Sequence, residues 1–79
     1  MITTPEKPQF KSDIKVLLGR RVKQLRTEAG LGQVTLAAQC DIFRTYLSRI
    51  ENGSANPTIT VVAALALALK VEVAELLTE

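Results

Sequence analysis

Two short helical segments, residues 33–39 and 44–52, constrain the fold of this 79-residue chain more than any other feature. The four residues between them include no proline and no glycine, so Asp41 is the best candidate for a left-handed turn residue. Each segment is shorter than the roughly 12 residues that an isolated helix needs in water. The two segments are therefore expected to fold as one rigid unit that other helices brace.

The segment before this unit has helical spacing. Apolar residues between positions 14 and 25 recur on one face and predict a helix over about residues 13–29. Ser12 and Asp13 offer an N-cap and a first-turn acid, and Gly30 supplies its stop. Residues 1–12 contain two prolines and no periodicity, so we expect a flexible N-terminal arm ahead of a single domain over residues 13–79.

The segment after the unit is also helical. Thr58 is expected to cap a fourth helix that runs to Leu69 and breaks at Lys70 or Val71, and Ile59 is counted among its core-facing residues. Residues 73–77 add a last short turn of helix. No strand is expected, so the predicted fold class is all-α, with five helices.

Composition excludes most chemistry. The chain has one cysteine and no histidine, which rules out an intramolecular disulfide, makes a zinc site untenable and excludes histidine-based catalysis. We expect no enzyme activity, no metal and no cofactor, and Cys40 is interpreted as a small buried residue. The apolar stretch over residues 61–69 falls short of the about 20 residues that span a membrane. With no secretory signal, the expected location is the cytoplasm, on the nucleoid.

Charge is distributed unevenly along the chain. Residues 11–53 carry eight basic and four acidic side chains, whereas residues 54–79 carry one basic and three acidic side chains. The basic part is suited to a polyanion, although an ordinary solvated surface explains the same numbers equally well.

The two short helices together match a helix-turn-helix, in which the second helix is held out to enter the major groove of DNA. Ala37 is small where the helices would cross, and Leu47 and Ile50 would point inward. The outward residues of the second helix are of types that reach base edges and phosphates. They are Arg44, Thr45, Ser48, Arg49 and Asn52.

Residues 31–37 (LGQVTLA) and 44–53 (RTYLSRIENG) closely resemble the phage repressor and Cro family, also called the Xre-type helix-turn-helix family. Residues 56–59 (NPTI) and the closing segment fit the same pattern. The resemblance implies a compact five-helix repressor-like domain that binds operator DNA as a two-fold dimer. Residues 44–48 are also similar to the small controller proteins of restriction-modification systems.

Three positions depart from the family pattern. Gly32 replaces a capping threonine or serine before the first short helix, and Asp41 replaces the usual glycine of the turn. Phe43 stands where the recognition helix usually has a capping serine, aspartate or threonine, and a missing cap costs roughly 0.5–2 kcal/mol.

Residue roles follow from position and chemistry. Base contacts are assigned to Arg44, Thr45, Ser48 and Arg49, with a phosphate contact as the alternative for Ser48. Phosphate contacts are assigned to Gln33, Tyr46, Asn52, Ser54 and Asn56. Gln33 is also expected to brace Arg44, Tyr46 could equally pack inward, and the loop residues could serve only turn chemistry. The resemblance further implies a structural ion pair between Arg26 and Glu51.

The fourth helix is apolar on more than one side, and a helix of this kind is normally buried all round. A partner copy is the expected cover, although alanine is also a good helix former. The predicted dimer interface consists of Val61, Ala64, Leu67, Ala68, Val71 and Val73. A two-fold dimer would place its recognition helices about 34 Å apart.

The sequence therefore predicts a DNA-binding transcriptional regulator that binds a pseudo-palindromic operator in double-stranded DNA as a homodimer. The alternative is an antitoxin-type or other protein-interaction module that uses the same fold.

Overall fold

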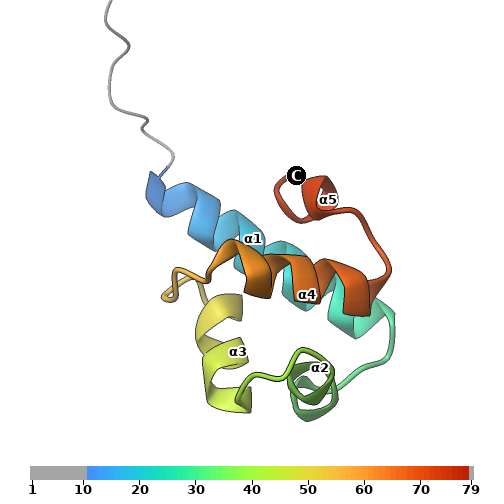
Figure 1. The fold of residues 1–79 in the computed structure, drawn as a ribbon. Helices are drawn as coiled ribbons and strands as arrows, with labels where there is room; N and C mark the ends of the chain where they lie inside the picture. The colour runs from blue at the N-terminus through green and yellow to red at the C-terminus, as the bar shows by residue number, and fades with distance from the viewer. Residues whose placement is uncertain (1–10, 79) are drawn as a thin grey trace, which may run out of the picture.

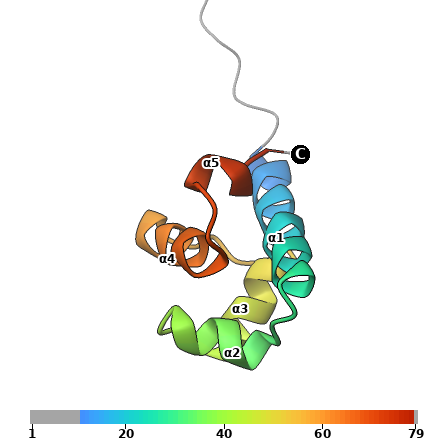
Figure 2. The same cartoon turned by 90° about the vertical axis from the view of Figure 1, so that its right-hand side faces the viewer.

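The computed structural model describes residues 11–78, with side chains from residue 14 onward, and confirms the all-α fold with five helices. These are α1 (Lys11–Glu28), α2 (Gln33–Gln39), α3 (Arg44–Glu51), α4 (Ile59–Leu69) and α5 (Val73–Leu76). Figures 1 and 2 show α2 and α3 at one end of the molecule and α5 at the other, with α1 and α4 between them. No helix within the described range is long and apolar enough to cross a membrane.

The first helix begins earlier than predicted. It starts at Lys11, so Ser12, the expected N-cap, lies inside its first turn together with Asp13, the expected first-turn acid. Residues 1–10 of the predicted arm lie outside the described residues. The predicted stop is confirmed, because Gly30 adopts φ +74° and the Leu31 amide donates to the carbonyl of Arg26 at 3.0 Å.

The turn between α2 and α3 has the left-handed residue that the sequence indicated. Asp41 adopts φ +57°, a conformation that aspartate tolerates better than most residues. The chain then reverses so that the Ile42 amide donates to the carbonyl of Ala37 at 3.0 Å. This bond closes the end of α2 and fixes the direction in which α3 leaves the turn.

The cap of α4 is confirmed, but its core-facing stripe is only partly as predicted. The Thr58 hydroxyl accepts a hydrogen bond from the Val61 amide at 3.3 Å, and the helix ends at Lys70 in a left-handed conformation. Ile59, expected in the core, is 72% exposed. The core side of α4 is centred on Val62 and Leu65, which leaves the first residue of the helix at its edge.

The core is a single cluster to which every helix contributes. Its largest fully buried side chains are Val22, Leu36, Leu47, Ile50, Leu65 and Leu76. Cys40 is buried beside them, and desolvation raises the pKa of its thiol above the ordinary value. The thiol is therefore neutral at neutral pH, in keeping with its predicted role as a small apolar residue.

A glycine lets α1 approach the end of α3 more closely than any other residue could. A Cβ atom at Gly19 would lie 2.2 Å from the carbonyl oxygen of Ile50 and 2.7 Å from that of Glu51. Both contacts are with backbone, which cannot rotate away as a flexible side chain would. The spacing between α1 and α3 is therefore set by the absence of a side chain at Gly19.

We expect Gly19→Ala to destabilise the protein, because the added methyl forces α1 and α3 apart. Overpacking of this kind typically costs about 1–3 kcal/mol, and the gain in helix propensity offsets at most about 1 kcal/mol. Urea unfolding followed by circular dichroism measures the change. Arg20→Ala is the matched control, because Arg20 is the next residue of α1 and is exposed. Equal stability of the two variants would contradict the close approach.

Candidate nucleic-acid interface

A buried ion pair connects α1 to the end of α3. The Arg26 guanidinium donates from Nε to Glu51 Oε2 at 2.6 Å and from Nη2 to Oε1 at 2.9 Å. Its Nη1 donates to the carbonyl of Leu31 at 2.9 Å. Both residues are buried, so this two-pronged geometry is needed to offset the desolvation of the two charges.

The hydrogen bonds to Glu51 raise the pKa of the Arg26 guanidinium above its ordinary value, against the opposing effect of burial. Since that ordinary value is already alkaline, Arg26 remains charged at neutral pH. The charged guanidinium therefore connects α1 to the end of α3.

The third helix has a buried side and an outward side. Leu47, Ile50 and Glu51 face the interior, and the residues of the other side are exposed or half-buried. Arg44, Thr45, Arg49 and Asn52 are exposed, and Ser48 is half-buried between them and the neighbouring helices. The structure thus leaves three of the four predicted base-contacting side chains exposed, those of Arg44, Thr45 and Arg49.

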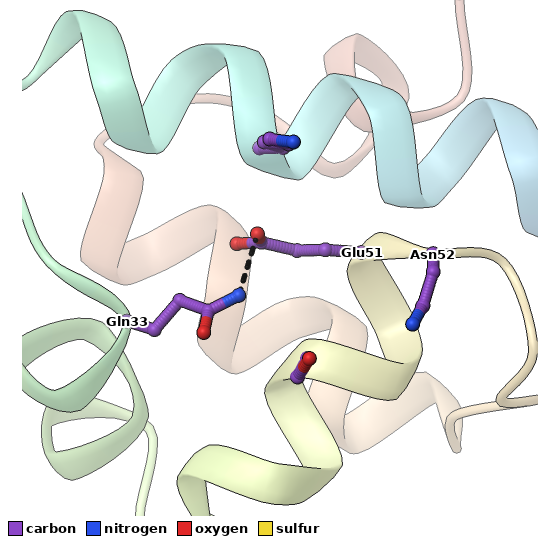
Figure 3. Close-up of a pocket in the computed structure, with 5 residues that line it drawn as sticks. Gln33, Glu51 and Asn52 are labelled. Carbon is purple, nitrogen blue, oxygen red and sulfur yellow. Dashed lines mark hydrogen bonds between the residues drawn. The ribbon is translucent and has the colours of Figure 1, made fainter.

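Gln33, the first residue of α2, makes a different contact from the one expected. Its Nε2 donates to Glu51 Oε1 at 3.0 Å, as Figure 3 shows, whereas the sequence analysis placed it against Arg44. Arg44 and Glu51 lie at opposite ends of α3, about 10 Å apart along its axis, and the hydrogen bond of Gln33 is with the Glu51 end. The amide instead connects α2 to the same carboxylate that binds Arg26.

A shallow polar pocket of about 210 Å³ lies between α1, α2 and α3. Its lining consists of Lys23, Gln33, Ser48, Glu51 and Asn52, which Figure 3 draws as sticks. Lys23 was not among the contact residues predicted from the sequence. Its position three residues before Arg26 puts it one turn earlier on the same side of α1, which is the signal that could have identified it.

The other predicted phosphate contacts divide into two groups. Tyr46 is half-buried and packs against the core, which is the inward alternative considered for it. The Ser54 hydroxyl donates to the carbonyl of Arg49 at 3.2 Å and so takes part in the turn after α3. Asn52 ends α3 as its C-cap, and Asn56 is exposed in the loop that follows.

The predicted dimer residues are exposed to different degrees. Leu67 is 81% exposed. The other five are half-buried and pack against the core of their own chain: Val61, Ala64, Ala68, Val71 and Val73. Ala63 and Ile59 lie four and eight residues before Leu67 and are also exposed, so they complete an apolar stripe along one side of α4.

The chain matches a family model described as a helix-turn-helix domain over residues 17–78. It is 38% identical over 69 residues to the control protein C.MunI of Mycoplasma sp, a match that covers 86% of this chain and 93% of that protein.

Two solved structures are similar to the whole fold. The restriction-modification controller protein C.AhdI of Aeromonas hydrophila superposes with a TM-score of 0.76 at 39% identity, over 78% of this chain and 94% of that one. The biofilm regulator SinR, solved in complex with DNA, superposes with a TM-score of 0.72 at 37% identity, over 77% and 98% of the two chains.

We expect single replacements in the ion pair to be far more harmful than replacement of the whole pair. Arg26→Met leaves the Glu51 carboxylate buried without its partner, which typically costs about 3–5 kcal/mol. In Arg26→Met/Glu51→Leu neither charge remains, so much of that loss should be recovered. Urea unfolding of wild type, both single variants and the double variant gives the coupling energy. Additive losses would show that the two side chains do not act as a pair.

Proposed function

Because the chain belongs to the helix-turn-helix domain family, among transcriptional regulators of the phage repressor and Cro type and not among enzymes, we propose that it regulates transcription by binding a specific operator. It binds double-stranded DNA as a homodimer, with α3 in the major groove of each half-site. The operator is a pseudo-palindrome, since a two-fold protein dimer reads the same sequence twice in opposite directions.

The observation that carries this proposal is the division of α3 into a buried and an outward side. Arg44, Thr45 and Arg49 are exposed together, whereas the ion pair at Glu51 fixes the other side to α1. Side chains held on a rigid helix can match the fixed donor and acceptor pattern of base edges. In this proposal Arg44 donates to guanine, and Thr45, Ser48 and Arg49 contact neighbouring bases.

Phosphate contacts come from the polar side chains around α3. Asn52 lines the pocket beside Lys23, so these two side chains can hold one backbone phosphate between α1 and α3, and Ser48, which lines the same pocket, has this phosphate as its alternative partner. Asn56 and Ser54 extend these contacts along the strand. Gln33 can donate to a phosphate only through the second N–H of its Nε2, because the first is bound to Glu51. Tyr46 is assigned to packing, with its hydroxyl as a further donor.

The homodimer is proposed to form through α4. The stripe of Ile59, Ala63 and Leu67 exposes apolar surface that a second copy would cover. The half-buried residues beside it, Val61, Ala64, Ala68, Val71 and Val73, form the rim of that contact. A two-fold dimer that binds two successive major grooves must hold its two α3 helices about one turn of DNA, or about 34 Å, apart.

Selection of bound duplexes from a random pool tests the function directly. We expect enrichment of one short inverted repeat whose half-sites are centred about 34 Å apart. The logarithm of the binding constant for this repeat should fall linearly with the logarithm of the salt concentration, because binding releases counterions from the DNA. A pool that stays random would overturn the proposal and favour the protein-interaction module, and enrichment of a single unrepeated site would overturn the homodimer.

We expect Arg44→Ala to relax the preference for one base pair in each half-site. Loss of a bidentate contact to guanine costs about 1–3 kcal/mol on the selected operator and much less on random DNA. Fluorescence anisotropy titrations on both duplexes at one salt concentration measure the difference.

Lys23→Ala is the matched control for this experiment. It also removes one exposed cation, but from the phosphate pocket, so it should weaken binding to both duplexes equally and lower the salt slope by about one. If Arg44→Ala behaved in the same way, its assignment to a base edge would be wrong.

A further inference from the structure

The most exposed large apolar side chain in the described part of the chain stands at the entrance to α3. Phe43 is 82% exposed and is not among the side chains packed against the core. It occupies the N-cap position of α3, where its side chain makes no capping hydrogen bond. Its aromatic ring therefore contributes neither to the core nor to the start of the helix.

The neighbours of Phe43 indicate what covers it. Arg44 and Thr45 follow it directly and are also exposed, and both are proposed to contact bases. Consecutive Cα atoms are about 3.8 Å apart, close to the rise of about 3.4 Å between base pairs. A ring at position 43 is therefore suited to the base pair adjacent to the one that Arg44 contacts.

In the major groove, the Phe43 side chain can find one kind of apolar partner, which is a methyl group on a base. The other groups there are hydrogen-bond donors and acceptors, whereas thymine presents a methyl group at C5. A 5-methylcytosine presents the same methyl group at the same position of the ring. An apolar side chain cannot distinguish the two pyrimidines by hydrogen bonding, so the methyl is the feature that it detects.

We propose that Phe43 reads the C5 methyl group of a pyrimidine next to the base pair contacted by Arg44. The proposal rests on the proposed operator binding, but it adds a contact that does not depend on any hydrogen bond. It also makes the affinity of the protein for DNA sensitive to the methylation of cytosine wherever that pyrimidine is a cytosine.

The test uses the duplex recovered by selection and compares probes that differ by one methyl group. At each pyrimidine of a half-site, thymine is compared with deoxyuridine opposite adenine, and 5-methylcytosine with cytosine opposite guanine. Burial of one methyl corresponds to an increase in affinity of about three- to fivefold. We expect this ratio at one pyrimidine position per half-site, adjacent to the position at which Arg44→Ala relaxes base preference.

Variants assign the effect to the residue. In Phe43→Ala the ratio should fall to about one, and Phe43→Leu should keep part of it. Thermal unfolding should be nearly unchanged in both, because the side chain is exposed. Val34→Ala is the matched control, since Val34 is another exposed apolar residue of the helix-turn-helix but lies on α2, and its ratio should equal that of wild type.

The outcomes distinguish a thymine methyl group from a 5-methylcytosine methyl group. They also distinguish failure of the role proposed for Phe43 from failure of the operator-binding proposal. A methyl effect confined to the thymine probes identifies thymine as the source, and an effect in the cytosine probes identifies 5-methylcytosine. Specific binding without any methyl effect, or an effect that persists in Phe43→Ala or disappears in Val34→Ala, overturns the role of Phe43. If selection enriches no sequence, the operator-binding proposal itself has failed.

Discussion

The orientation of α3 depends on the carboxylate of Glu51. This one group accepts two hydrogen bonds from Arg26 on α1 and a third from Gln33 on α2, so three helices meet at two oxygen atoms. Gly19 lets the backbone of α1 approach the same end of α3. A helix of eight residues would not be stable alone, so α3 depends on these tertiary contacts for its stability.

Most helix boundaries could be predicted from local sequence preferences. Gly30, Asp41 and Thr58 mark helix ends by their own backbone and capping preferences, and each is found in the predicted role. Ile59 was assigned wrongly, because α4 is apolar on several sides and its periodicity does not identify which side faces the core. The neighbouring helices decide that question, and their positions are not contained in the spacing of one segment.

The sequence predicted which residues of the site lie on the outward side of α3. It did not predict which side chains form hydrogen bonds with one another. The outward side of α3 followed from helical geometry, and the structure leaves Arg44, Thr45 and Arg49 exposed. The partner of Gln33 was not predictable, because it depends on a contact between residues 18 positions apart in the chain. Lys23 was missed although its helical spacing from Arg26 places it on the same side of α1, while its neighbours Ser48 and Asn52 are set by the packing of α1 against α3.

The exposed residues of α3 and its buried residues lie on different sides of the helix. Substitutions on the outward face can therefore accumulate with little effect on folding, whereas Leu47, Ile50 and Glu51 are restricted by their neighbours. In a lineage of such regulators, preference for a target sequence can diverge while the scaffold is inherited unchanged. Duplicated copies can then acquire separate targets through a few substitutions in one short helix.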